Sequence, residues 1–307
     1  MRRVLRLGLR GLLWLLGLAL AVALAIVAVA EWNYRAAVRQ PRVAQLPADA
    51  GAGDAGRPVL ILLHGAGLNG HMWDAVRRHL DPAWRVIALD LPGHGLRRDQ
   101  PYSLEGASAT IAAAARAVAP APVLLVGDSL GGYSAIAAAS ALPATQLRGL
   151  VIAGSSANFD GAMQWPRYVK DIATITAMVA VVDQKDFANR ALGLFGVAEA
   201  DRAAIIAAGV HLPAVPQAGR ALIHVDMRSR LAAIEAPVLI VNGAQDTRAV
   251  AQEASFVAAA RHGTHYRFDD TGHGVSMRRP ADFARVINDF ARQHAARPAP
   301  GPAGTRG

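Results

Sequence analysis

The chain has 307 residues, which is long enough to bury a full hydrophobic core in about one or two domains. It contains no cysteine, which excludes a disulfide framework, a thiolate nucleophile and a thiolate metal site. Part of the formal net charge of +9 comes from Arg2, Arg3, Arg6 and Arg10, and the rest is spread along the chain, so no clustered basic stripe indicates nucleic-acid binding.

Residues 11–30 form the first predicted element, a helix without a charged side chain. A helix of this length spans about 30 Å, the thickness of the hydrocarbon core of a bilayer. Arginines precede the segment and Glu31 follows it, which predicts that the N-terminus stays in the cytoplasm and the rest is exported. We therefore predict a membrane anchor within residues 1–35 that holds the protein at the inner membrane, on its outer, periplasmic side. The alternative is secretion after cleavage following Ala30, because residues 28–30 have the small-x-small form of a signal-peptidase site.

Residues 36–56 are predicted to be a linker, since Pro, Gly and Ala dominate this part of the chain. After it, short apolar runs alternate with segments of helical periodicity. The predicted strands are 58–63, 85–91, 122–126, 147–153, 237–241 and 264–268, and the predicted helices include 104–119, 130–142, 249–261 and 280–294. This alternation predicts the α/β class, with a doubly wound, mostly parallel sheet covered on both faces.

One interval, residues 156–226, interrupts the alternation and is too long for a plain loop. It carries no clear strand, and it is predicted to be a helical cap or lid inserted between core segments 57–155 and 227–295. Large apolar side chains in the interval could line a binding site or form the core of the cap itself; they are Met163, Trp165, Tyr168, Met178, Phe187 and Phe195. Residues 296–307 are predicted to be a disordered tail.

Distinctive polar motifs follow several predicted strands. In an open parallel sheet, ligands bind beyond the carboxyl ends of the strands, so these motifs are expected to meet at one edge. They are HGAG at 64–67, DLPGHG at 90–95, GDSLGG at 127–132, NGAQD at 242–246 and GHG at 272–274. No spacing of histidine with acidic residues indicates a metal site.

Ser129 lies in the sequence Gly-Asp-Ser-Leu-Gly, which matches the G-x-S-x-G turn between a strand and a helix. The turn is crowded, and the residues two before and two after the serine, Gly127 and Gly131, have no side chain. A helix that begins at residue 130 would direct backbone N–H groups toward the serine. The alternative for this motif alone is an ordinary glycine-rich turn.

A serine nucleophile needs a base and an acid that orients the base. Asp246 and His273 follow Ser129 in that order, each at the end of a later strand. Asp246 could instead cap the helix that follows it. Asp270 and Asp226 are weaker candidates for the acid.

Acyl transfer also needs N–H donors for the developing oxyanion. The candidates are the backbone N–H groups of Leu130 and of Ala66 in the HGAG loop. His64, His94 and Asp90 are predicted to hold turns in place rather than to react, whereas Asp128 receives no role.

Together these five motifs resemble the α/β-hydrolase family, in its serine-nucleophile esterase and lipase-like branch, over about residues 57–295. The resemblance implies Ser129 as nucleophile, Asp246 as acid, His273 as base, and Ala66 and Leu130 as oxyanion donors. It also implies that the 156–226 insertion covers the site. Asp128 departs from the family, which often has His or an apolar residue there, and so does Leu96, which replaces a small polar residue.

We therefore expect a serine hydrolase that acts on a small-molecule carboxylic ester with a small to medium apolar group, through an acyl-enzyme. No metal or organic cofactor and no nucleic acid is expected as a partner, whereas residues 11–30 are expected to contact the membrane. The alternatives are a carbon–carbon bond hydrolase or a cofactor-free perhydrolase that uses the same triad, or a non-catalytic binding protein with this fold. The oligomeric state stays open.

Overall fold

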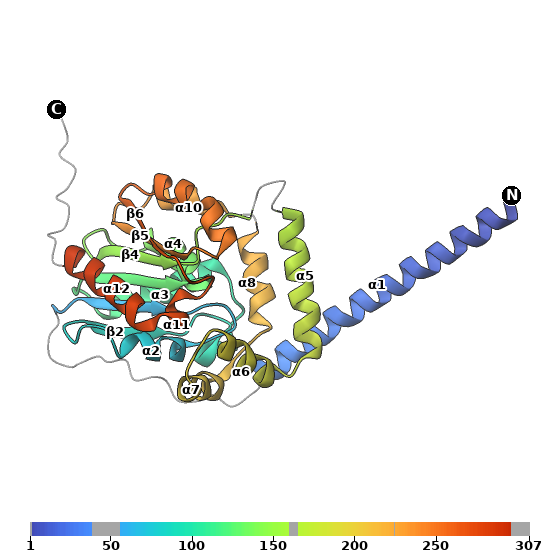
Figure 1. Cartoon of the computed structure of the whole chain (residues 1–307), viewed down its shortest axis with the longest axis horizontal. Coiled ribbons are helices and arrows are strands. Elements are labelled where there is room, and N and C mark those ends of the chain that lie inside the picture. Colours follow the sequence, from blue (N-terminus) through green and yellow to red (C-terminus); the bar gives the residue numbers. More distant parts are fainter. Residues whose placement is uncertain (1, 39–55, 160–164, 224, 296–307) are drawn as a thin grey trace.

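The computed structural model describes residues 2–38, 56–159, 165–223 and 225–295 (Figure 1). Most of the predicted linker over 36–56 and the whole predicted tail over 296–307 lie outside the described residues.

A six-stranded parallel sheet forms the centre of the protein, in the order β2-β1-β3-β4-β5-β6. Its strands are β1 (Val59–Leu63), β2 (Arg85–Leu89), β3 (Val123–Asp128), β4 (Leu147–Ala153), β5 (Val238–Gly243) and β6 (Gly263–Phe268). All six predicted strands are confirmed. Strands β1, β3, β4 and β5 are runs rich in Val, Ile and Leu that are buried in the sheet, whereas β6, at its edge, contains none of these residues and is largely exposed. The strand order reverses direction between β1 and β3, which places their carboxyl ends at a point where ligands commonly bind.

Helices cover both faces of this sheet. They are α2 (Asp74–Arg77), α3 (Leu104–Ala117), α4 (Leu130–Ala139), α10 (Thr247–Ala259), α11 (Val275–Arg278) and α12 (Pro280–His294), with short 3-10 turns η1 (Gly70–Trp73) and η2 (Gly95–Arg97). The helices predicted over 104–119, 130–142, 249–261 and 280–294 are confirmed to within a few residues at their ends. The α/β class and the doubly wound sheet are thus confirmed.

The alternation of side chains along β1 shows how the two cores form. Ile61 packs with Ile111 and Ile136 on the face covered by α3 and α4. Leu60 and Leu62 point the other way, into a second core that contains Trp73 of η1 and Phe283 of α12. Each large apolar side chain that is removed from water in this way stabilises the fold by about 1.5–3 kcal/mol.

The segment between β4 and β5 contains helices α5 (Trp165–Val181), α6 (Gln184–Leu194), α7 (Glu199–Gly209), α8 (Ala214–Leu222) and α9 (Met227–Ala232). In its described residues, this segment has no strand, as the sequence predicted for 156–226. Helices α5 and α8 lie side by side at one end of the sheet (Figure 1).

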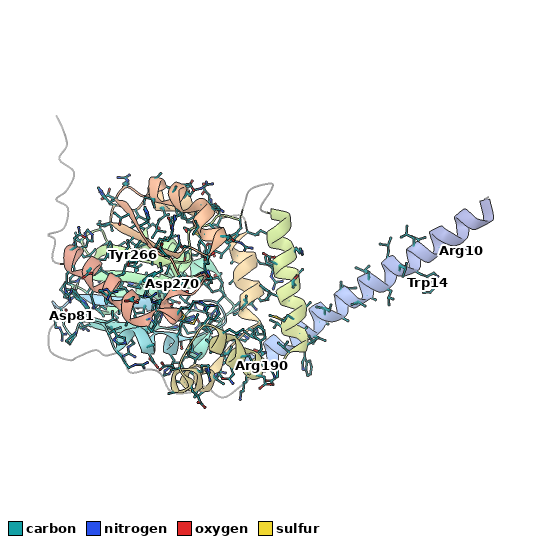
Figure 2. The ribbon with its side chains drawn as sticks, viewed as in Figure 1. Arg10, Trp14, Asp81, Arg190, Tyr266 and Asp270 are labelled. Atoms are coloured by element: carbon teal, nitrogen blue, oxygen red, sulfur yellow. The ribbon has the colours of Figure 1, made fainter. Side chains whose placement is uncertain are left out.

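Helix α1 (Arg2–Val38) projects from the rest of the protein, and its C-terminal end lies beside α5 (Figure 1). Figure 2 shows Arg10 and Trp14 on the projecting part, where Trp14 is 81% exposed. Among the described residues, we find no helix that combines the length and the apolar character needed to cross a membrane. The predicted transmembrane helix over residues 11–30 therefore has no support from the structure.

Candidate active site

The turn from β3 into α4 holds Ser129 in a strained conformation, with φ of 51° and ψ of −113°. Among the described residues other than glycine, Ser129 alone has a positive φ. Its N–H donates to the carbonyl of Ala153 over 2.7 Å, and its own carbonyl accepts from the Ser155 hydroxyl over 2.8 Å. A backbone in this region costs about 1–3 kcal/mol and persists only where its surroundings enforce it.

The glycines around Ser129 are required by close backbone contacts. A Cβ on Gly127 would lie 2.3 Å from the carbonyl carbon of Gly131, and a Cβ on Gly131 would lie 2.0 Å from the Leu63 oxygen. These distances are far below van der Waals contact, so the predicted need for small residues at both positions is confirmed. The tight turn is what exposes the Ser129 hydroxyl at the end of the sheet.

His273 and Asp246 lie next to this hydroxyl, although both come from later loops. Nε2 of His273 is 3.1 Å from Oγ of Ser129, and Nδ1 is 2.6 Å from Oδ2 of Asp246. Both separations suit hydrogen bonds in which Nδ1–H donates to the carboxylate and Nε2 accepts from the serine. This arrangement is the one that a general base needs.

Asp246 performs two structural roles at once. Its Oδ1 accepts from the N–H of Ala249 at the start of α10, so the helix-cap alternative is confirmed, and this contact does not compete with the one to His273. The other oxygen is free to orient His273. Burial by itself would raise the pKa of Asp246, but the hydrogen bond and charge of His273 outweigh it and lower the pKa.

The pKa of His273 is raised above its usual value. Burial acts to lower it, whereas the hydrogen bond to Asp246 and the charges of Asp128 and Asp246 raise it by more. His273 therefore accepts a proton more readily than an isolated imidazole. Its side chain is still 47% exposed, so a substrate could reach it.

The weaker acid candidates lie elsewhere. Asp270 pairs with Arg279, and Asp226 caps α9 and bonds to the hydroxyl of Ser229. No hydrogen bond or ion pair between described residues joins either carboxylate to His273.

The two predicted oxyanion donors, Ala66 and Leu130, both line the cavity at Ser129. In the part of the chain that the structure describes, neither backbone N–H donates to a protein acceptor. Free N–H groups beside Ser129 are of the kind that could stabilise an oxyanion formed there.

Buried histidines hold the HGAG loop in place. His64 accepts from the N–H of Leu91 through Nε2, and its Nδ1 lies 2.8 Å from the carbonyl of Gly65. His94 accepts from the N–H of Gly67 over 2.9 Å. Burial lowers the pKa of both rings, so both are neutral and can donate with one nitrogen while they accept with the other.

Asp90 completes these turns, because its two oxygens accept from the N–H groups of Gly70 and Leu96. The prediction that His64, His94 and Asp90 hold turns is confirmed.

Two cavities meet at Ser129 and His273. The larger, of about 640 Å³, lies between α5, α8 and the sheet, and Lys170, Asp171 and Arg248 are among the residues that line it. The smaller, of about 250 Å³, extends under α6 and is mostly apolar; Met178, Phe187 and Phe195 are among its walls. These three cap residues therefore line the site. Met163 lies outside the described residues, and for Trp165 and Tyr168 the structure describes the backbone alone.

The sequence interpretation missed Gly154, at the end of β4. Its φ is 59°, and a Cβ there would lie 2.9 Å from Cε1 of His273, so glycine leaves room for the imidazole. The signal was available, since Gly154 follows a predicted strand as the other site motifs do.

Comparison with known proteins identifies the relatives of this chain. Residues 60–286 match the model of the alpha/beta hydrolase family. A pimeloyl-[acyl-carrier protein] methyl ester esterase from Edwardsiella ictaluri is 30% identical over 248 residues, which cover 77% of this chain and 94% of that protein. The enzyme of the same name from Aromatoleum aromaticum is 31% identical over 258 residues, covering 77% of this chain and 99% of that protein.

Solved structures share the fold at lower identity. MenH from S. aureus is 19% identical with a TM-score of 0.65, covering 78% of this chain and 94% of that one. A thermophilic esterase from Thermogutta terrifontis is 23% identical with a TM-score of 0.62, covering 78% and 90%. These two structures share the fold. The family model over residues 60–286 and the relatives at 30% identity or more show that the chain belongs to the alpha/beta hydrolase family.

Proposed function

We propose that this protein is a serine hydrolase that cleaves carboxylic esters through an acyl-enzyme intermediate. The observation that carries the proposal is the chain of hydrogen bonds from Ser129 through His273 to Asp246, at the junction of two cavities. The esterase names of the curated relatives support the ester as substrate class.

In the proposed mechanism, Oγ of Ser129 attacks the ester carbonyl carbon while its proton moves to Nε2 of His273. Asp246 stabilises the resulting imidazolium, and the N–H groups of Ala66 and Leu130 stabilise the oxyanion. The same proton then passes to the departing alkoxide, which leaves as the alcohol. Water that gives a proton to His273 attacks the acyl-enzyme, and the acid and the free serine are regenerated.

The substrate that we propose carries a small to medium apolar group. The small cavity of about 250 Å³ favours this, because Met178, Phe187 and Leu192 give it an apolar wall. The larger cavity is open and has charged residues at its edge, so it can accept a longer or more polar part of the ester. The relatives act on the methyl ester of a carrier-bound acyl chain, which agrees with an ester that has one small and one long side.

A fluorophosphonate probe tests the nucleophile. We expect the native protein to be labelled and Ser129→Ala to stay unlabelled. Ser140→Ala, at the exposed C-terminal end of α4, is the matched serine control and should label like the native protein. Equal labelling of native protein and Ser129→Ala would refute the assignment.

A substrate panel then tests the reaction class. Hydrolysis of 4-nitrophenyl esters well above that of matched amides and diketones, without peracid formation from hydrogen peroxide, supports the ester. If the labelled protein prefers a diketone, it is a carbon–carbon bond hydrolase, and if it forms peracids, it is a perhydrolase. A protein that binds esters without turning them over would be a binding protein.

The location of the protein is a separate proposal that rests on the sequence. We propose that it is held at the inner membrane with its candidate active site on the periplasmic side, or secreted after cleavage following Ala30. The exposed apolar side chains of Leu13, Trp14 and Leu15 on α1 support a contact with lipid. The intact mass of the exported protein separates the two forms, and loss of residues 1–30 would contradict retention.

A further inference from the structure

Asp128, directly before the nucleophile, is a buried carboxyl that the mechanism above does not use. It is 2% exposed and lies at the end of β3, among the walls of the smaller cavity. A buried carboxylate is costly unless it is paired or hydrogen-bonded, so its presence calls for a physical reason.

Its main partner is Ser276. The Ser276 hydroxyl donates to Oδ2 of Asp128 over 2.5 Å, and both side chains are buried. Ser276 comes three residues after His273, on the short helix α11. The backbone N–H of Ser276 also hydrogen-bonds to this carboxyl. The contact between Ser276 and Asp128 therefore connects the turn that carries the nucleophile to the loop that carries the base, across 148 positions of sequence.

No arginine or lysine among the described residues forms an ion pair with Asp128. The cation that Asp128 faces is His273, once that ring is protonated. Burial raises the pKa of Asp128, as does the charge of Asp246 to a smaller extent, while the charge of His273 and the hydrogen bonds from the hydroxyl and backbone N–H of Ser276 act in the opposite direction.

The other charged groups that face His273 also have to be counted. Asp246 bonds to its Nδ1, Arg248 of α10 opposes its protonation, and Arg278 of α11 donates to its backbone carbonyl. Asp128 acts on the ring from the β3 side, which none of these residues occupies.

We propose that Asp128 is a positioning residue that anchors the His273 loop through Ser276 and that its negative charge favours the imidazolium formed in each acyl transfer. Asp128 itself neither gains nor loses a proton in the step: the Ser129 proton moves to Nε2 of His273, and Asp128 stabilises the positive charge that results. This role rests on the proposed function, because it needs His273 to act as the base.

Two variants separate the charge from the anchor. Asp128→Asn removes the charge but can still accept a hydrogen bond from Ser276, whereas Ser276→Ala keeps the carboxyl and removes the hydroxyl donor, leaving the backbone N–H of residue 276. Asp201→Asn is the matched control, since Asp201 is also a buried aspartate but pairs with Arg78, away from His273. Asp128→Ser is a second charge-free variant should the asparagine not fold, and circular dichroism checks the fold of each.

The measurement is the rate of inactivation by a fluorophosphonate between about pH 5 and 9, which needs no knowledge of the natural substrate. In Asp128→Asn, we expect the acidic limb of the profile to move to lower pH by about one unit. The plateau rate should fall about three- to tenfold, because the base is weaker. In Ser276→Ala, the plateau rate should also fall, but the acidic limb should move less than in Asp128→Asn. Asp201→Asn should give the same pH profile as the native protein.

The outcomes are distinct. A folded Asp128→Asn or Asp128→Ser whose acidic limb coincides with that of the native protein overturns the inference, as does a Ser276→Ala variant with the native plateau. Variants that melt earlier without any movement of the limb show a merely structural role and also overturn it. Failure of the native protein itself to react would instead refute the proposed function.

Discussion

Gly131→Ala is the substitution whose effect the structure defines most closely. A Cβ at Gly131 would lie 2.0 Å from the backbone oxygen of Leu63 and 2.9 Å from that of His64. Leu63 belongs to β1, which is paired on one side with β2 and on the other with β3. Neither backbone can move away without breaking the ladder of hydrogen bonds at the centre of the sheet.

The magnitude follows from the overlap. Ordinary contact begins at 3.4 Å, so the backbones would have to separate by 3.4 − 2.0 = 1.4 Å at this point. Overpacking of a rigid core costs about 1–3 kcal/mol and occasionally more, and we expect the upper end here. The higher helix propensity of alanine offsets up to about 1 kcal/mol of this cost, so the free energy of unfolding should fall by about 2–3 kcal/mol in total. For a chain of this size, that lowers Tm by about 5–10 °C.

Thermal unfolding and fluorophosphonate labelling of the same preparations test this value. Gly193→Ala is the control, because a Cβ there would meet only the Arg202 guanidinium at 3.5 Å, within a helix. The control should be as stable as the native protein or slightly more stable. A Gly131→Ala protein that melts within about 1 °C of the native protein and labels at the native rate would refute the claim that the turn is rigid.

Three further predictions concern charge and shape. Asp246→Asn should lower kcat about 10³- to 10⁴-fold, because the imidazole loses its orienting carboxylate. The control Asp270→Asn should keep kcat within about twofold of the native value in the same ester assay. Equal losses of kcat in the two variants would refute Asp246 as the acid. Ala191→Leu fills part of the smaller cavity. Hydrolysis of 4-nitrophenyl hexanoate should therefore fall at least about tenfold relative to hydrolysis of 4-nitrophenyl acetate. An unchanged ratio of the two rates would show that the acyl group of the ester binds elsewhere. The pKa of Asp226 is lowered to about 2, first by the Ser229 hydroxyl, so its contribution to stability is present above the usual aspartate range and is lost as the pH falls from about 4 toward 2. Because that side chain is 44% exposed, the contribution is below about 1 kcal/mol. Urea unfolding should show that the difference in free energy of unfolding between the native protein and Asp226→Asn becomes smaller from about pH 5 to 3. A difference that does not change with pH would contradict this assignment.

Local signals were sufficient to predict the sheet and the meeting of its strand-end motifs. Residues 59–63 are all apolar and fully buried, and such short apolar runs are typical of the inner strands of a parallel sheet. Parallel strands put their carboxyl ends at one edge, so Ser129, Asp246 and His273 could be placed together from their positions after strands alone.

The sequence could not indicate contacts between residues that no motif relates. Nothing near Asp128 points to Ser276, because a single serine after a histidine has no pattern of its own. Gly154 differs in that its position after a predicted strand was a usable signal, but its purpose, room for the His273 ring, is seen only in the structure. The predicted transmembrane helix rested on hydropathy and flanking charge alone, and the described structure does not support it.

The turn at 127–132 is held by these remote contacts and not by its own conformational preferences. Ser129 has a backbone that serine avoids, and Asp128 is a carboxyl removed from water, so both are locally unfavourable. Their anchors come from two later segments: Ala153 and Ser155 bind the Ser129 backbone, and Ser276 binds the Asp128 carboxyl. Removal of either anchor should therefore weaken the turn, even though the motif stays intact. The G-x-S-x-G motif by itself therefore does not account for the conformation of this turn.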